Sequence, residues 1–142
     1  MTEPQEVEVL QIPSTLDYLE QVDAAVERTA RAMGFGEGAC ADLGICATEA
    51  AANAIVHAHG QNPGLVVEIQ IERYPDRILI AVRDHGSGFE TNSVPDPTLP
   101  ENLMKVSGRG MHLIHALMDT VRVLRHSDGM QVIMTKQLTR ES

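Results

Sequence analysis

Two stretches of alternating side chains, each interrupted by a turn signal, most constrain what this 142-residue chain can form. Apolar and polar residues alternate through residues 65–84, on both sides of Tyr74-Pro75-Asp76. Residues 121–135 contain two β-favouring runs on either side of Ser127-Asp128-Gly129. A short turn between two such runs is typical of a β-hairpin. The sequence therefore predicts two hairpins.

The N-terminal quarter predicts one strand and one amphipathic helix. Residues 6–12 are short and β-favouring. Apolar residues then recur at helical spacing over about 15–33, and the glycine at position 34 ends the pattern. Ser14 and Asp17 resemble a capping box, with Asp in place of the usual Glu.

The middle of the chain predicts a helix, a long loop and another helix. Residues 37–59 contain eight alanines, which would let this helix lie close against a sheet or a ligand. Residues 85–107 contain glycines and prolines that break any periodicity. A loop of this length is uncommon in a compact domain and is often a lid. A third helix is predicted after Gly108, and no internal repeat or linker is visible.

Composition excludes some classes of function. The net charge of −9 would repel a phosphate backbone, and aromatic residues make up only 3%, so direct nucleic-acid binding is not expected. Residues 1–50 carry ten acidic and two basic residues. This excess is typical of a solvated helix face, and a docking surface for a basic partner is the alternative.

Cysteine usage and hydropathy predict a cytoplasmic protein without a membrane partner. Cys40 and Cys46 have neither CxxC nor zinc-finger spacing and are expected to be reduced thiols in the core. The acidic N-terminus shows no signal peptide. The apolar stretches are expected to fall far short of the roughly 20 residues that span a bilayer.

Three short segments contain the residues expected to do chemistry. In the second helix, Glu49, Asn53 and His57 are four residues apart and therefore share one helix face. A carboxylate and an amide on an alanine-lined face can present oxygens to Mg²⁺. Taken alone, Glu49 and Asn53 are more typical of solvated residues on a helix surface. His57 alone is more typical of a polar residue near a helix end whose hydrogen bonds are satisfied.

The second segment, Asp84-His-Gly86-Ser-Gly88, directly follows a predicted strand. Glycines allow close backbone approach, which suits a carboxylate that hydrogen-bonds a ligand. A glycine-rich turn is the alternative. The third segment, Gly108-Arg109-Gly110-Met111, opens a helix, where free amides and the helix dipole attract anions. An ordinary loop-to-helix junction is the alternative there.

The order and spacing of these three segments resemble the N, G1 and G2 boxes of the GHKL ATPase fold. Within that fold, the chain is similar over nearly its whole length to the anti-sigma factor serine-protein kinases of the RsbW type. The resemblance implies an α+β fold: a two-layer sandwich with helices on one face of a mixed, mostly antiparallel sheet. It implies one domain over residues 1–142, with an ATP lid at about 89–107.

The resemblance also implies roles for individual residues. Asn53 would coordinate Mg²⁺, and Glu49 would be the general base toward the substrate serine. Asp84 would bind the adenine amino group, while Gly86 and Gly88 would line the base pocket. The phosphates of ATP would be held at the start of the third helix by Gly108, Arg109, Gly110 and Met111. The resemblance gives His57 no role, and Lys105 in the lid is a further candidate for phosphate contact.

By the same resemblance, the partners would be a sigma factor and an anti-anti-sigma protein with a STAS domain, and the protein would be a homodimer. Two other functions compete with this one. An ATP-binding switch without significant kinase activity would bind a phosphatase or signalling partner, and has less need of a base at Glu49. A detached catalytic domain of a sensor histidine kinase would be expected to carry Asn at that position.

Overall fold

The computed structural model describes residues 3–58, 64–84, 109–126 and 129–138, and the side chains of 57, 58, 109 and 110 lie outside this description. The elements in chain order are β1 (Glu6–Pro13), the 3₁₀ turn η1 (Leu16–Tyr18), α1 (Leu19–Met33), α2 (Glu37–Asn53), the π-helical turn η2 (Ala54–Ala58), β2 (Val66–Arg73), β3 (Arg77–Asp84), α4 (Arg109–Leu117), β4 (Thr120–His126) and β5 (Gly129–Gln137).

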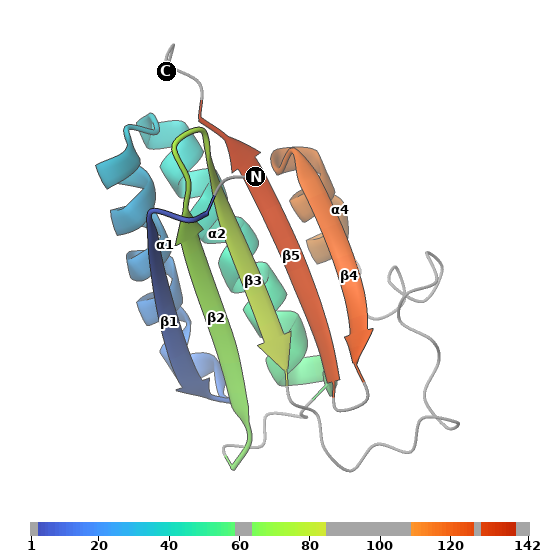
Figure 1. Cartoon of the computed structure of the whole chain (residues 1–142). Helices are drawn as coiled ribbons and strands as arrows, with labels where there is room; N and C mark the ends of the chain where they lie inside the picture. Colours follow the sequence, from blue (N-terminus) through green and yellow to red (C-terminus); the bar gives the residue numbers. More distant parts are fainter. Residues whose placement is uncertain (1–2, 59–63, 85–108, 127–128, 139–142) are drawn as a thin grey trace.

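The strands form one five-stranded sheet in the order β1-β2-β3-β5-β4 (Figure 1). Both predicted hairpins are confirmed, because β2 pairs with β3 and β4 pairs with β5. Every neighbouring pair of described strands is antiparallel, so the expectation of a mixed sheet is wrong. The reason is that β4 runs along the outer edge, and its hairpin returns β5 into the space beside β3.

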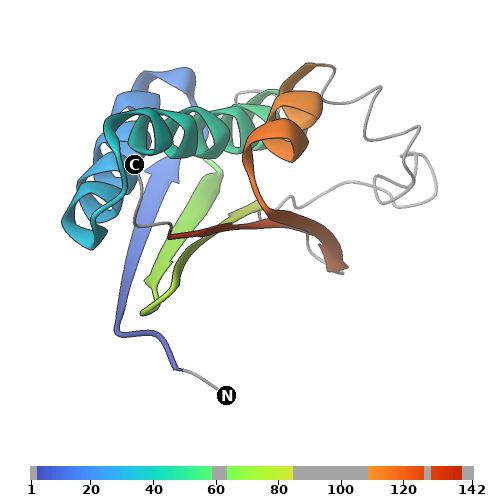
Figure 2. The ribbon, with the colours of Figure 1, turned by 90° about the horizontal axis from the view of Figure 1, so that it is seen from above.

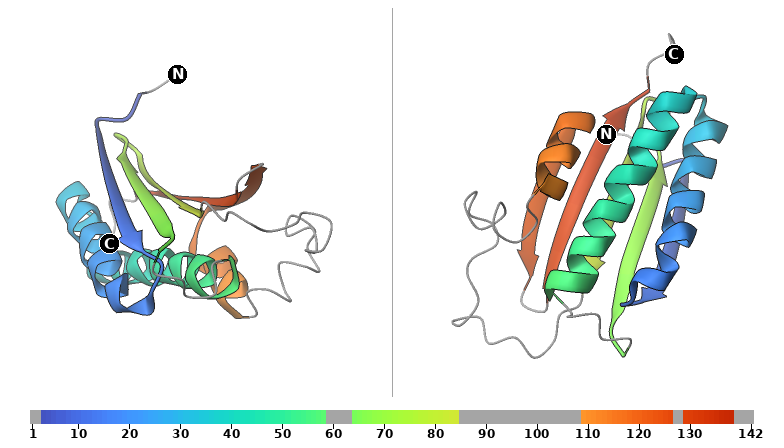
Figure 3. Two further views of the ribbon diagram at one scale, coloured as in Figure 1. Left: turned by 90° about the horizontal axis from the view of Figure 1, so that it is seen from below. Right: turned by 180° about the vertical axis from the view of Figure 1, so that it is seen from behind.

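The molecule has two layers. Seen from above, the helices lie on one side of the sheet (Figure 2). From behind, α1, α2 and α4 lie side by side across that face, with α2 in the middle (Figure 3). The fold class predicted from the sequence, an α+β sandwich with helices on one face, is thereby confirmed.

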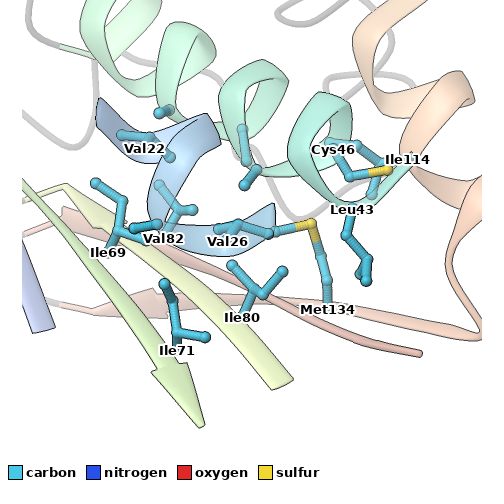
Figure 4. Close-up of a cluster of buried hydrophobic side chains, with 14 of the residues drawn as sticks. Val22, Val26, Leu43, Cys46, Ile69, Ile71, Ile80, Val82, Ile114 and Met134 are labelled. Atoms are coloured by element: carbon cyan, nitrogen blue, oxygen red, sulfur yellow. The ribbon is translucent and has the colours of Figure 1, made fainter. Parts of the chain in front are cut away.

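Apolar side chains at every second position of the strands face the helices and form the core between the two layers. Val67, Ile69 and Ile71 of β2 are buried toward the helices, and so are Ile78 and Ile80 of β3. They meet side chains from α1, α2, α4 and β5 in one cluster (Figure 4). Burying an aliphatic side chain of this size stabilises the fold by about 1.5–3 kcal/mol.

The first strand changes the phase of its apolar residues midway, and the structure shows why. Ile12 and Leu10 lie on the helix side and pack on the core. Val7 and Val9 fall on the opposite face of the sheet, where they are 46% and 50% exposed. One strand therefore presents apolar side chains to both faces.

The first helix begins differently from the prediction. A 3₁₀ turn precedes it, and the N-cap of that turn is Thr15 and not the predicted Ser14; Thr15 makes no side-chain cap bond. Ser14 is instead buried, and its backbone N–H donates to the Leu65 carbonyl at 2.9 Å. Ser14 thus ties the end of β1 to the start of β2. Gly34 ends α1 as predicted, with a left-handed φ of 102°.

The second helix also departs from its predicted length. The α-helix ends at Asn53, and the next five residues form a π turn instead of continuing the same spiral to residue 59. A π turn widens the helix from i→i+4 to i→i+5 hydrogen bonds. The face shared by Glu49 and Asn53 therefore does not extend to His57 at the same angle.

The segment Glu37–Val56 has the length and apolar composition of a membrane-crossing helix, with a mean hydropathy of 1.3. This corrects the expectation that the apolar stretches fall far short of such a length. Half of the segment's best window is buried inside the domain, where α1, α4 and the sheet contact it. Its hydropathy is therefore that of a core helix.

Two acidic side chains of α1 lie over a glycine of α2. A Cβ added at Gly44 would stand 2.0 Å from Asp23 Oδ1 and 2.9 Å from Glu27 Oε2, so the glycine makes room for both carboxyls. A hydrogen bond with Asp23 and partial burial raise the pKa of Glu27.

We expect Glu27→Gln to raise the melting temperature at pH 7 by about 1–2 °C, because it removes the repulsion between Glu27 and Asp23 at i,i+4, which costs about 0.2–0.5 kcal/mol. The ion pair of Glu27 with Arg31, which is also lost, spans 3.7 Å to an exposed guanidinium and contributes less than this repulsion, since the net shift of the Glu27 pKa is upward. A raised pKa means that the folded protein holds the proton more tightly than the unfolded chain. The penalty is therefore present at pH 7 and lost as the pH falls through the raised pKa toward the ordinary value of 4.5. Thermal unfolding followed by circular dichroism at pH 7 and pH 4 measures this.

Glu3→Gln is the matched control, since Glu3 is an exposed carboxyl outside every helix and strand. An equal rise in the melting temperature for both variants would attribute the effect to net charge and contradict the pairwise explanation.

Candidate functional site

Three elements that are distant in sequence carry the described residues of the predicted site: α2 with its turn η2, β3 and α4. The turn η2 contacts β3, and α2 contacts α4. Glu49 and Asn53 lie on the last turns of α2, and Asp84 is the last residue of β3. Arg109 and Gly110 begin α4, although their side chains are not described. The predicted residues Gly86, Gly88, Lys105 and Gly108, with the predicted lid, lie outside the described residues.

Asp84 is held in a defined orientation. It is 6% exposed, and its Oδ1 accepts a hydrogen bond from the Met130 backbone N–H at 3.2 Å. A buried carboxylate is costly unless hydrogen bonds compensate it, so this contact favours one side-chain position. Sequence reasoning missed this contact, because Gly129 appeared there only as the end of a hairpin turn and Met130 as the start of the next strand.

Glu49 and Asn53 follow one another at i,i+4 on α2, as predicted. Both residues are half-buried. The part of each side chain near the backbone is therefore packed, while its polar end can reach solvent. Their neighbours on the buried side are Ala47, Ala50 and Ala51. These alanines pack in the core beneath the two polar side chains, and the ligand-binding role of this face stays a prediction.

The short helix α4 is fixed along one face and at its C-terminus. Met111, Ile114 and Met118 are buried against the core. Lys136 of β5 donates from Nζ to the Leu117 carbonyl at 2.8 Å, which places a positive charge at the negative end of the helix. Packing of Met111 therefore holds the N-terminal end of α4, where the anion site is predicted, and Lys136 caps the opposite end.

The described residues contain no cluster of three His, Cys, Asp or Glu that would cage a metal ion. Mg²⁺ bound with a nucleotide does not need one, since it commonly takes one or two protein oxygens and completes its shell with phosphates and water. The amide oxygen of Asn53, the residue predicted to coordinate the ion, is a donor of this hard-oxygen type. The residues present therefore fit a nucleotide-bound Mg²⁺.

The two cysteines are free and buried, as predicted. Cys46 lies one turn before Glu49 and packs beside Leu43 and Ile114 (Figure 4). Burial raises the pKa of its thiol to about 11, and the carboxylates of Asp42 and Glu49 add to the effect. Burial likewise raises the pKa of Cys40. Neither thiol has the low pKa and exposure of a reactive cysteine.

The fold is a two-layer α+β sandwich with an antiparallel five-stranded sheet. A family model described as the histidine kinase-like ATPase domain matches residues 12–136, and the chain belongs to this family.

Two named relatives show which members of this family the chain resembles. The chain is 31% identical over 138 residues to the serine-protein kinase RsbW of Bacillus cereus (strain Q1), a match that covers 93% of this chain and 85% of the relative. The identity and coverage are the same for the serine-protein kinase RsbW of Bacillus anthracis (strain CDC 684 / NRRL 3495). The predicted resemblance to RsbW-type serine-protein kinases is confirmed.

A solved structure agrees on the fold. The crystal structure of the RsbU and RsbW domains of a Mycobacterium tuberculosis protein superposes with a TM-score of 0.67. The match covers 98% of this chain and 34% of that one. At 18% sequence identity, this likeness concerns the fold alone.

We expect Cys46 to react with a thiol reagent such as Ellman's reagent at least about 100-fold more slowly than a free cysteine at pH 8. A pKa of about 11 leaves on the order of one thiol in a thousand ionised at that pH, and burial excludes the reagent. In guanidinium chloride, where the chain is unfolded, the reagent should modify both cysteines at the rate of a free cysteine. Rapid modification of the folded protein would contradict the buried positions of Cys40 and Cys46.

Proposed function

We propose that this protein is an ATP-dependent protein-serine kinase that acts as an anti-sigma factor. It sequesters a sigma factor and phosphorylates a serine of an anti-anti-sigma partner with a STAS domain. The relatives named serine-protein kinase support the activity, since the match covers most of their length as well as most of this chain. The single observation that carries the proposal is the buried, hydrogen-bonded Asp84 at the end of β3, next to the helix that holds Glu49 and Asn53.

Asp84 binds the exocyclic amino group of adenine. A carboxylate accepts hydrogen bonds and cannot donate them, so it selects a ring that carries an amino group at this position. Burial strengthens the selection, because water competes poorly for the same acceptor. Gly86 and Gly88 follow directly in the chain and line the base pocket.

The triphosphate lies at the N-terminal end of α4. The first amides of a helix have no partner within the helix, and the dipole places positive charge there. Gly108 and Gly110 let phosphate approach the backbone, and Arg109 supplies a guanidinium. Met111, buried in the core, fixes the start of the helix beneath them. The residues at about 89–107 form the lid over this site.

Asn53 holds Mg²⁺ through its amide oxygen, and the ion supplies charge neutralisation to the phosphates when ATP is bound. Glu49, one turn earlier, takes the proton from the hydroxyl of the substrate serine. The serine oxygen then bonds to the γ-phosphorus, and the bond from that phosphorus to the bridging oxygen of ADP breaks. A single placed carboxylate is enough, because phosphoryl transfer depends on positioning more than on covalent help.

The partners are proteins. The acidic first fifty residues favour a basic docking surface on one of them. We further propose that the chain is one domain over residues 1–142, that it is a cytoplasmic homodimer, and that it has no direct nucleic-acid or membrane partner.

We expect Glu49→Ala to lower the rate of phosphate transfer to the STAS partner by about 10²–10⁴-fold, the usual cost of losing a general base. Nucleotide affinity should stay within about three-fold of the native value, since the carboxylate acts on the serine. Transfer of radiolabel from γ-labelled ATP and calorimetry with ADP measure the two quantities.

Asp42→Ala is the matched control, because Asp42 is an acidic residue two turns earlier on the same helix. Full transfer by Glu49→Ala would contradict its role as the base. No transfer by the native protein to any STAS partner would favour an ATP-binding switch without kinase activity.

We expect Asp84→Asn to weaken ATP binding by about 10–150-fold, which corresponds to the 1.5–3 kcal/mol of a hydrogen bond to a charged group. Asp76→Asn, in the exposed turn at the other end of β3, should leave the affinity unchanged. Calorimetry with ATP and Mg²⁺ measures both variants. An unchanged affinity in Asp84→Asn would place the adenine elsewhere.

A further inference from the structure

Gly129 is in closer contact with Asp84 than any residue with a side chain would allow. It is the first residue of β5 and has a φ of 150°. A Cβ at this position would stand 2.2 Å from the Asp84 backbone oxygen and 2.7 Å from its Oδ1. These distances are far inside van der Waals contact, and one of the atoms belongs to backbone. The contact therefore cannot be relieved by moving a flexible side chain.

The residue that follows Gly129 makes the hydrogen bond that orients the carboxylate. Met130 donates its N–H to Asp84 Oδ1 at 3.2 Å, across 46 residues of sequence. This amide reaches the carboxylate only because β5 starts against the end of β3. A side chain at position 129 would push the two strand ends apart, and Oδ1 would lose its position relative to the amide.

We infer that Gly129 is a positioning residue for base recognition: it lets the Met130 amide hold one oxygen of Asp84, so that the carboxylate selects a purine ring with an exocyclic amino group. The inference rests on the proposed role of Asp84 toward adenine. Gly129 does not touch the nucleotide itself. It affects nucleotide specificity through Asp84. A glycine needed only to form the hairpin would have no effect on that specificity.

The preference for one nucleotide over a close analogue distinguishes a role of Gly129 in base recognition from a role in the hairpin alone. ATP and purine riboside triphosphate differ in the 6-amino group and share the ribose and triphosphate. We expect the native protein to prefer ATP by about ten-fold or more, the worth of one charge-assisted hydrogen bond. Gly129→Ala should reduce this preference to within about two-fold, and it should leave the affinity for the analogue within about three-fold. Calorimetry with Mg²⁺ measures both affinities.

Gly34→Ala is the matched control, because Gly34 also has a positive φ, of 102°, but a Cβ there meets nothing within 4 Å. It should lower the melting temperature and keep the native preference for ATP. Equal weakening of both nucleotides in Gly129→Ala would overturn the inference and assign the glycine to the hairpin alone. An unchanged ATP preference would overturn it as well.

Asp84→Asn distinguishes failure of the inference from failure of the proposed function. If Asp84→Asn abolishes the ATP preference and Gly129→Ala does not, the adenine contact stands and the role of Gly129 is wrong. If Asp84→Asn keeps the preference, the adenine contact itself is wrong and the inference is overturned with it. In Asp84→Ala, adding Gly129→Ala should change the preference no further, because the carboxylate is already absent.

A measurement on the native protein covers the case in which Gly129→Ala does not fold. The amide resonance of Met130 should shift when ADP is added, because the adenine amino group draws charge from the carboxylate that accepts this amide. The same resonance should move much less when purine riboside diphosphate is added. Equal shifts with both nucleotides would overturn the inference.

Discussion

Close packing of one helix built from small side chains is the constraint on which the rest of the structure depends. Most of the residues that α2 buries are alanine, glycine or cysteine. Such side chains let the helix backbone approach the sheet, and the large aliphatic residues of the strands fill the space between them. Because α2 lies between α1 and α4, its position also determines theirs. Glu49 and Asn53 are therefore carried by a helix that contacts α1, α4 and the sheet.

The order of the strands gives the site its second fixed part. The C-terminal hairpin places β5 beside β3, so the end of β3 meets the start of β5. This pairing brings the Met130 amide to Asp84. The same strand carries Lys136, which caps α4. The single strand β5 thus positions both Asp84, the carboxylate proposed to bind adenine, and α4, the helix proposed to bind phosphate.

Much of the fold was predictable because it depends on local periodicity. Both hairpins follow from alternation around a turn, and Gly34 ends α1 because it adopts a left-handed conformation. Some of the failed predictions are those in which a tertiary contact overrode a local signal. Ser14 was expected to cap a helix, and it is buried at the junction of β1 and β2. The π turn after Asn53 likewise has no signal in the periodicity of the chain.

The sequence by itself determined which residue types are available to the site and which of them share an element, because helical spacing places Glu49 and Asn53 on one face. It also determined that Asp84 lies at the end of a strand. Only the tertiary structure decided that Asp84 is buried, that a backbone amide holds it, and that Gly129 must lack a side chain. The physical reason is that these contacts join strands paired across 46 residues, and a hydrogen bond of this kind leaves no periodic pattern in the chain.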